Sequence, residues 1–226
     1  RLKPAAVLLT HGHVDHVWSV APVCGARNIP AYIHPADRML LSDPAKGFPL
    51  GVGQQLFDGL TLTEPDDVKE LADGMILNLV GLSIVVDHMP GHTRGSVTFR
   101  LPGTSGTSGA AGAGGTGADE AAGADEAAGA EAPHETVAGG RAAGSVAEPV
   151  LFSGDLLFAG SIGRTDLPGG DYPTILRSLA KTMTLPDQTL VLSGHGPQTT
   201  IGTERHRNPF LTDLPDQHRG PVTRGL

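Results

Sequence analysis

The sequence Thr-His-Gly-His-Val-Asp-His at residues 10–16 decides how this chain is interpreted. Four potential metal ligands, His11, His13, Asp15 and His16, fall within six residues, and histidine is the commonest metal ligand in proteins. The chain holds 10 histidines in 226 residues, so chance would give this pattern roughly once in a thousand such chains. A solvated or core histidine cluster is therefore a poor alternative, and the run predicts a metal centre.

The residues on either side predict a strand-to-helix turn around this run. Residues 5–9 form an apolar stretch that is typical of a buried strand. After the run, Val17, Trp18, Val20 and Val23 recur at helix-like spacing. The four candidate ligands therefore lie in a turn that can point several side chains at one spot.

Three further turns of small residues carry candidate ligands at the ends of predicted strands. His92 lies in Pro-Gly-His-Thr, Asp155 ends Ser-Gly-Asp, and His195 lies in Ser-Gly-His-Gly. Strands are predicted at residues 83–87, 96–101, 150–152 and 189–192. Glycine in each turn allows the backbone to approach a crowded centre.

Together these positions supply seven candidate ligands, enough for two metal ions: His11, His13, Asp15, His16, His92, Asp155 and His195. Imidazole and carboxylate ligands suit zinc and also iron or manganese. The single cysteine, Cys24, excludes a cysteine-rich structural zinc site, so the pattern favours an open, catalytic one.

The order of these four motifs resembles the metallo-β-lactamase superfamily over nearly the whole chain outside residues 103–148. The resemblance implies an α/β fold, the αββα sandwich. It also implies that His11, His13 and His92 bind a first metal and that Asp155 bridges it to a second. The ligands of the second metal would be Asp15, His16 and His195.

Within the superfamily, residues 158–168 and 195–202 look like the compact bacterial glyoxalase II-like hydrolases. A bridging Asp155 disfavours a true β-lactamase, because those enzymes generally lack a bridging carboxylate. The sequence departs from the family pattern in two ways. The strands that usually precede the first motif have no counterpart, so we expect a sandwich lacking its N-terminal strands. The long helical domain with which larger glyoxalase II enzymes hold glutathione has no counterpart after His195, which leaves the thiol carrier open.

The resemblance implies a metal-dependent hydrolase that cleaves a small-molecule 2-hydroxyacyl thioester such as S-D-lactoylglutathione. Two divalent cations, zinc first with iron or manganese as alternatives, would activate the attacking water. Asp15 is the candidate catalytic residue, because it could orient that water as well as bind metal. Two alternatives remain open. One is a mononuclear iron persulfide dioxygenase, which residues 163–166 also resemble, although residues 196–200 favour hydrolysis. The other is a non-catalytic, truncated remnant.

The distribution of charge and hydropathy limits which binding partners and which cellular compartment we expect for this protein. Residues 103–148 hold seven acidic residues and one base, Arg141, and so carry three quarters of the net charge of −8. The remainder has no basic stripe, which argues against a nucleic-acid substrate. No apolar run reaches eighteen residues, and residues 1–4 lack the layout of a signal peptide. We therefore expect a cytoplasmic protein without a membrane partner, with Cys24 as a buried core thiol.

The composition of the sequence predicts one domain and two irregular segments. A single domain is expected over residues 1–211, interrupted at 103–148 by a Gly- and Ala-rich acidic insertion expected to be disordered. The insertion would be an overgrown hairpin loop, and residues 212–226 a flexible tail. Residues 42–73 are expected to be loop. Asp171 is expected to cap a helix whose apolar face holds Ile175, Leu176, Leu179 and Met183.

Several polar residues keep more than one interpretation. His34 resembles a family feature, but a supporting role is as well founded as direct binding. His88 can face the same side as His92. Arg164 is expected to pair with Asp166 rather than to reach an anionic substrate. For Tyr172 and Asn208 no role is favoured, and neither is counted as a ligand.

Overall fold

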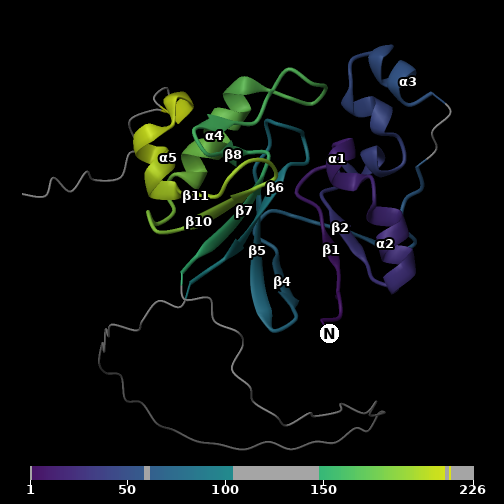
Figure 1. Cartoon of the computed structure of the whole chain (residues 1–226), viewed down its shortest axis with the longest axis horizontal. Helices are drawn as coiled ribbons and strands as arrows, with labels where there is room; N and C mark the ends of the chain where they lie inside the picture. The colour runs from purple at the N-terminus through teal and green to yellow at the C-terminus, as the bar shows by residue number, and fades with distance from the viewer. Residues whose placement is uncertain (1, 59–61, 104–147, 212–213, 215–226) are drawn as a thin grey trace, which may run out of the picture. The chain divides into compact units, whose positions relative to one another are not determined.

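The computed structural model describes residues 2–58, 62–103, 148–211 and 214 (Figure 1). The expected disorder of the insertion concerns residues that, apart from 103 and 148, lie outside this range. The same holds for the expected tail, except at Leu214. That side chain is buried in a core cluster that includes Leu211.

The N-terminal part of the described chain forms a three-stranded parallel sheet with helices on one side. Its order is β1-β2-β3, with Val7 paired to Ala31 and Ala31 to Val68. The elements, in chain order, are β1 (Val7–Leu8), α1 (Val14–Val17), α2 (Val20–Arg27), β2 (Ala31–Ile33), the 3-10 helices η1 (Arg38–Leu41) and η2 (Pro44–Gly47), α3 (Val52–Leu56) and β3 (Val68–Glu70).

Helices α1 and α2 cover this sheet because one side of each is apolar. Val17, Val20 and Cys24 are buried against Leu9 and Ile33. The predicted helix is therefore present, but in two pieces, and its other apolar residues, Trp18 and Val23, are exposed. Cys24 is a free buried cysteine, as predicted, and burial raises the pKa of its thiol.

The expectation that residues 42–73 form only loop was wrong. This segment contains η2, α3 and the edge strand β3. Strand β3 pairs with β2 through the backbone, while Lys69 and Glu70 are exposed. Its sequence therefore lacks the alternating apolar pattern from which strands are recognised.

The C-terminal part forms a six-stranded mixed sheet in the order β11-β10-β7-β6-β5-β4. Strands β10 and β7 are parallel, and the other neighbours are antiparallel. The strands are β4 (Ile76–Leu79), β5 (Leu82–His88), β6 (Val97–Leu101), β7 (Val150–Gly154), β10 (Leu190–Ser193) and β11 (Thr199–Thr200). A hairpin of β8 (Leu157–Phe158) and β9 (Ser161–Ile162) precedes α4 (Tyr172–Thr182), and α5 (Ile201–Arg207) and η3 (Pro209–Leu211) follow β11.

Three of the predictions for this part are confirmed, and one strand was missed. Strands β6 and β7 are antiparallel neighbours with Leu101 opposite Val150, so the insertion does leave and re-enter the fold at a hairpin. Asp171 caps α4 by accepting a hydrogen bond from the Thr174 amide at 2.9 Å. On the predicted apolar face, Ile175, Leu179 and Met183 are buried, and Leu176 is partly buried against the same cluster. Strand β4 was not predicted, because its four residues, Ile-Leu-Asn-Leu, do not alternate between apolar and polar side chains.

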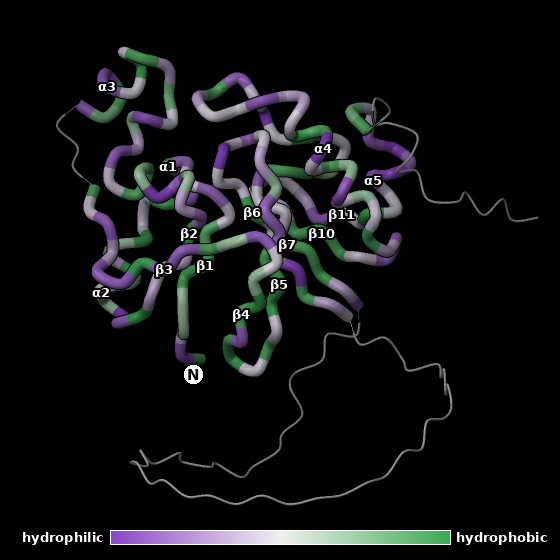
Figure 2. Tube along the Cα trace, turned by 180° about the vertical axis from the view of Figure 1, so that it is seen from behind, coloured by the Kyte–Doolittle hydropathy of each residue, from purple (hydrophilic) through white to green (hydrophobic). Residues whose placement is uncertain are grey.

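The two sheets pack face to face, with helices outside both. Tyr32 of β2 lies in one apolar cluster with Val86 and Phe99 of the larger sheet. On the other face of that sheet, Leu151 and Val191 pack against Ile175 of α4 and other helical residues. Figures 1 and 2 show these layers, with the apolar strands between α1–α2 and α4–α5. The order of layers is the predicted αββα sandwich.

Candidate metal centre

The seven predicted ligands come together where several strands end. His11 and His13 lie between β1 and α1, and Asp15 and His16 lie on α1. The other three follow strands of the larger sheet: His92 after β5, Asp155 after β7 and His195 after β10. Loops from both sheets thus build one cluster, as the motif positions predicted.

The first group consists of His11, His13 and His92. One nitrogen from each ring lies within 4.8 Å of the others, and His13 Nδ1 is 2.9 Å from His92 Nε2. The exposed fractions are 1%, 8% and 3%. Burial lowers the pKa of all three imidazoles, that of His13 to about 4. The rings are therefore neutral near pH 7 and have lone pairs to offer.

The second group consists of Asp15, His16 and His195, again with one ligand atom from each within 4.8 Å of the others. His195 Nε2 lies 3.1 Å from Asp15 Oδ2, and His16 Nε2 lies 3.5 Å from the same oxygen. The side chains of Asp15 and His195 are 53% and 57% exposed. This group therefore faces solvent, unlike the first.

Asp155 stands between the two groups. Its Oδ2 lies 3.7 Å from His92 Nε2 and 3.5 Å from His195 Nε2, while Oδ1 lies 3.4 Å from His16 Nε2. Burial opposes ionisation of this carboxyl, but the proximity of the three imidazoles outweighs it and lowers the pKa of Asp155. One carboxylate can thus serve both groups, as the expected bridge requires.

Unpartnered buried atoms indicate that the cluster suits cations. His11 Nε2, His13 Nε2, His16 Nε2 and Asp155 Oδ1 are buried without a hydrogen-bond partner among the described residues. Such atoms are rare in folded proteins because each loses its hydration without compensation. Lone-pair donors crowded in this way fit divalent metals, and imidazole with carboxylate is a donor set for zinc, iron or manganese.

Surrounding groups hold the first group in place. His92 Nδ1 lies 2.8 Å from the carbonyl oxygen of Arg164. A carbonyl only accepts, so Nδ1 carries the proton and the Nε2 lone pair faces the cluster. His11 Nδ1 lies 3.2 Å from Thr10 Oγ1. Both contacts orient a ring whose other nitrogen points into the site.

Asp37 is the functional residue that the sequence reasoning missed. It is 2% exposed, and its carboxylate accepts hydrogen bonds from Gly12 N at 3.0 Å, Thr93 Oγ1 at 2.6 Å and Gly95 N at 2.8 Å. It therefore ties the loop of the first motif to the loop that carries His92. Its neighbours in sequence, Ala36 and Arg38, gave no signal of burial, and nothing in its spacing linked it to the other motifs.

Two glycines of the predicted turns leave no room for a side chain. A Cβ on Gly194 would lie 2.3 Å from Asp155 Oδ1 and 2.8 Å from His16 Cε1. A Cβ on Gly12 would lie 2.8 Å from the side chain of Leu40. The close approach that the Gly-His motifs predicted is therefore present at these positions.

The remaining polar candidates lie outside the cluster. His34 and His88 stack on each other, with ring centroids 4.1 Å apart and planes at 7°. Arg164 and Asp166 form the predicted ion pair, with the Arg164 Nη2–Asp166 Oδ2 distance at 2.6 Å. Asn208 is buried and donates to Ser161 O and Glu204 Oε2, whereas Tyr172 is exposed. None of these six belongs to a metal-competent group among the described residues.

The face-to-face sheets and the clustered ligands define an αββα sandwich with a candidate metal centre at its strand ends. A family model described as the metallo-beta-lactamase superfamily matches residues 1–104 and 116–195. The chain belongs to the metallo-beta-lactamase superfamily. No described helix is long and apolar enough to cross a bilayer.

Curated relatives agree with this assignment. An uncharacterized protein of Mycobacterium tuberculosis (strain H37Rv) is 42% identical over 216 residues, which cover 95% of this chain and 79% of the relative. The "Probable metallo-hydrolase YqgX" of Bacillus subtilis is 34% identical, with 93% and 77% covered. The "Hydroxyacylglutathione hydrolase GloC" of Haemophilus influenzae is 30% identical, with 93% and 77% covered.

Solved structures with comparable sequence identity have the same fold. The BLEG-1 B3 metallo-beta-lactamase has a TM-score of 0.64 and 35% identity, over 93% of this chain and 78% of that one. TTHA1623, solved in a di-iron-bound form, has a TM-score of 0.61 and 34% identity, over 93% and 79%. This chain therefore shares its fold and a site for divalent metals with these proteins. The comparisons do not establish which metal it binds.

Proposed function

We propose that this protein is a dinuclear metallo-hydrolase that cleaves a 2-hydroxyacyl thioester, with S-D-lactoylglutathione as the model substrate. The observation that carries the proposal is the position of Asp155, whose two oxygens lie 3.4–3.7 Å from histidines of both ligand groups. The similarity to the hydroxyacylglutathione hydrolase of H. influenzae supports the choice of substrate.

The seven side chains would hold two cations, one at each group, with Asp155 shared. When bound, two such cations lower the pKa of water and polarise a carbonyl, which makes hydrolysis accessible near neutral pH. Zinc is the first choice because hydrolysis requires no redox change. Iron is the alternative, and a relative of 34% identity has been solved with two irons.

The chain's own residues supply orientation at the open side. Asp15 is half exposed and lies 3.1 Å from His195 Nε2, so its carboxylate can accept a hydrogen bond from the attacking water and direct its lone pair. The buried first group is screened from solvent by its loops. A thiolate leaves readily, so a thioester needs less general-acid assistance than an amide does.

The decisive experiment compares metals and substrates on one protein. Chain stripped of metal and reloaded with zinc alone should release thiol from S-D-lactoylglutathione without consuming oxygen, and Asp15→Asn should lower kcat by about 10²-fold or more. Asp166→Asn, at an exposed acid paired only with Arg164 among the described residues, is the matched control. If the zinc form is inert on thioesters and the iron form consumes oxygen with glutathione persulfide, the protein is a dioxygenase instead.

One further candidate activity has a specific observation behind it. The solved structure of 35% identity is described as a B3 metallo-beta-lactamase. The carboxylate between the ligand groups argues against that chemistry here, because β-lactamases generally lack one. The zinc-loaded protein should therefore turn over the thioester at least about 100-fold more efficiently than a penicillin or cephalosporin, as kcat/KM under the same conditions.

A further inference from the structure

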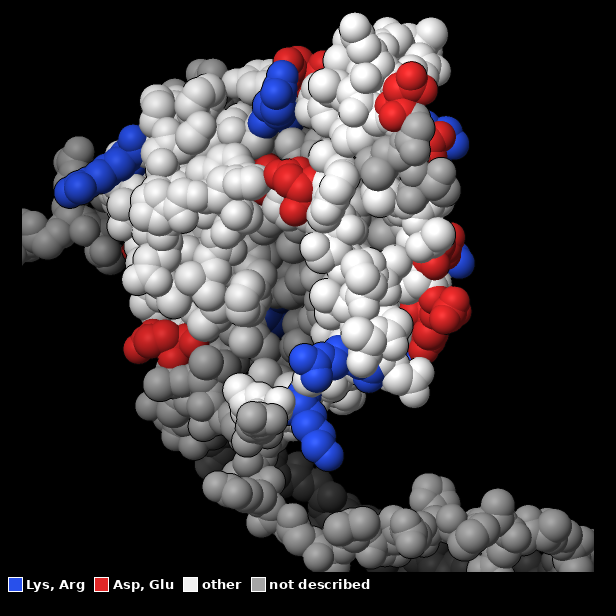
Figure 3. Space-filling model, turned by 45° about the vertical axis from the view of Figure 1, so that its right-hand side comes forward, with Lys and Arg blue, Asp and Glu red and all other residues white. Residues whose placement is uncertain are grey.

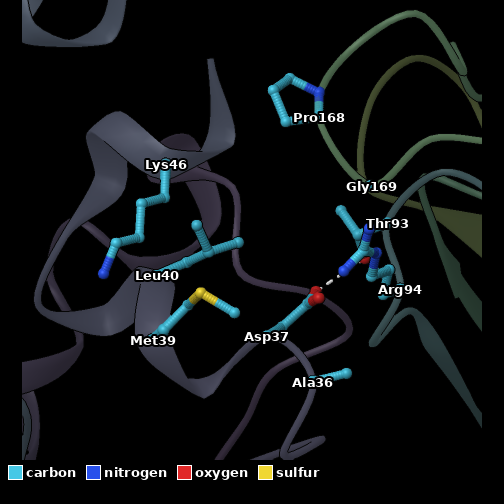
Figure 4. Close-up of a pocket in the computed structure, with 9 residues that line it drawn as sticks. All are labelled: Ala36, Asp37, Met39, Leu40, Lys46, Thr93, Arg94, Pro168 and Gly169. Atoms are coloured by element: carbon cyan, nitrogen blue, oxygen red, sulfur yellow. Dashed lines mark hydrogen bonds between the residues drawn. The ribbon is translucent and has the colours of Figure 1, made fainter. Parts of the chain in front are cut away.

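A cavity of about 210 Å³ lies beside the candidate metal centre, and none of the residues that line it is one of the seven ligands. Figure 4 shows its walls, which come from the η1–η2 region on one side and from the His92 loop and the loop before α4 on the other. The lining residues are Ala36, Asp37, Met39, Leu40, Lys46, Thr93, Arg94, Pro168 and Gly169.

The cavity shares its walls with the buried ligand group. Thr93 directly follows His92, and Asp37 binds the amide of Gly12, which separates His11 from His13. Leu40 packs against Gly12 and also near Gly47, where a Cβ would come within 3.3 Å of the His13 ring. A substrate whose acyl group lies at the metal centre could therefore reach this cavity with its other end.

Arg94 lines this cavity; hydrogen bonds fix its backbone, but its guanidinium forms no ion pair among the described residues. Its carbonyl oxygen accepts a hydrogen bond from His88 Nε2 at 2.9 Å, and the next amide, Gly95 N, donates to Asp37 at 2.8 Å. The backbone is thus fixed on both sides. Its guanidinium has no acidic partner within 4.0 Å among the described residues, in contrast to the paired guanidinium of Arg164.

The other charges in the wall are already satisfied. Lys46 lies 3.3 Å from Asp43, and in Figure 4 its amine points away from Arg94. The Asp37 carboxylate accepts hydrogen bonds from three donors on both of its oxygens. Figure 3 shows that acidic side chains are present at the hollow between the two halves of this face. Arg94 is therefore the group in the cavity free to bind an anion.

We propose that this cavity binds a carboxylate at the thiol end of the substrate, with the Arg94 guanidinium as its partner. A guanidinium pairs with a carboxylate through two parallel hydrogen bonds, which fixes orientation as well as charge. The proposal rests on the proposed thioesterase function. It assigns to Arg94 the selection of acidic thiols, such as glutathione, over neutral ones.

The test compares two thioesters that differ only in their carboxylates: S-D-lactoylglutathione and the same compound with both carboxyls ethyl-esterified. Arg94→Gln should raise KM for the acidic substrate about tenfold, leave kcat within about twofold, and leave the esterified substrate unchanged. Arg94→Lys should give an intermediate KM. Arg27→Gln, at an exposed arginine on α2, should change neither substrate.

A second readout separates this proposal from the proposed function. Calorimetric titration of metal-loaded protein with glutathione and with its diethyl ester should show about tenfold weaker binding of glutathione to Arg94→Gln and no change for the diester. That result supports the cavity even if neither thioester is hydrolysed. Equal effects of Arg94→Gln on acidic and esterified compounds, no effect on either, or no glutathione binding by the unmodified protein would overturn it.

Discussion

The two groups of candidate ligands differ more in their surroundings than in their chemistry. His11, His13 and His92 are at most 8% exposed, and a carbonyl, a hydroxyl and the Asp37 carboxylate fix their rings or loops. Asp15 and His195 are more than half exposed. The three imidazoles of the first group are therefore buried and fixed in orientation, while the second group is open to solvent on one side.

This difference assigns different tasks to the two groups. A preorganised, desolvated ligand set binds a cation tightly because little is lost in ordering it. An exposed set leaves room for water and substrate, which an open catalytic site requires. We therefore expect the buried group to anchor the centre and the exposed group to be where exchange and chemistry take place.

Removal of the carboxylate between the groups should have the largest effect. Asp155→Ala leaves His16, His92 and His195 without the oxygen atoms that lie 3.4–3.7 Å from them. Metal content should fall from about two equivalents to below one, and thioester turnover should fall by about 10³-fold or more. Elemental analysis and thiol release measure the two effects, with Asp166→Ala as control. One tightly held metal, unaffected by the substitution, would contradict a shared carboxylate.

Graded removal of metal should separate the two groups. Titration with a chelator should remove about one equivalent first, from the exposed group, and the second only at a roughly tenfold or higher concentration. His195→Ala should abolish the first, weakly held equivalent and leave the other in place. His13→Ala should weaken the tightly held one instead. Loss of both metals in a single step in the unmodified protein would mean that burial does not distinguish the groups.

A smaller effect is expected at Asp37, which acts on the buried group from outside. In Asp37→Asn one of the two oxygens becomes an amide nitrogen, which cannot accept from Gly12 N or Gly95 N. The affinity of the tight metal should fall about 10–100-fold, and the free energy of unfolding by about 2 kcal/mol. Competition with a chromophoric chelator and denaturant unfolding measure these. Asp43→Asn, at the exposed partner of Lys46, should change neither, and equal affinities in the two variants would refute the role of Asp37.

The parts of this comparison that could be predicted from sequence are those encoded locally. Each ligand motif carries its own turn glycine and follows an apolar strand, so the gathering of His11, His92, Asp155 and the others at one edge followed from short patterns. The α4 cap and its apolar face are local in the same way. Burial could not be predicted in this way, because no local motif indicates that His13 is buried while His195 is exposed.

The features that were missed depend on contacts between distant segments. Asp37 meets Gly12 and Gly95 across 25 and 58 positions, and its own neighbours in sequence do not reveal either partner. Strand β3 exists because β2 offers backbone hydrogen bonds, not because its side chains alternate. The role proposed for Arg94 likewise depends on the cavity that forms where the η1–η2 region faces the His92 loop.

The smallest effect is expected where the acidic insertion joins the fold, at a point that contributes no described residue to either ligand group. Leu101 and Val150 are paired as the last and first residues of β6 and β7. Beyond that pair, a Cβ on Gly103 would lie 2.8 Å from the nitrogen of Pro149, so the two ends of the segment already touch. Deleting residues 104–147 therefore leaves Pro102, Gly103, Glu148 and Pro149 as a short loop that needs no rearrangement of either strand.

The deletion should leave metal content at the unmodified value and kcat/KM within about threefold, because the described site draws no ligand from that segment. Unfolding should become slightly less favourable, by less than about 1 kcal/mol, since a shorter loop costs less to close. Elemental analysis, turnover and denaturant unfolding of the deleted chain measure these three quantities beside the full chain. If the variant folds and holds its metals but loses activity, the segment contributes to the open group, and the contrast between a buried anchor and a freely exposed partner would have to be redrawn.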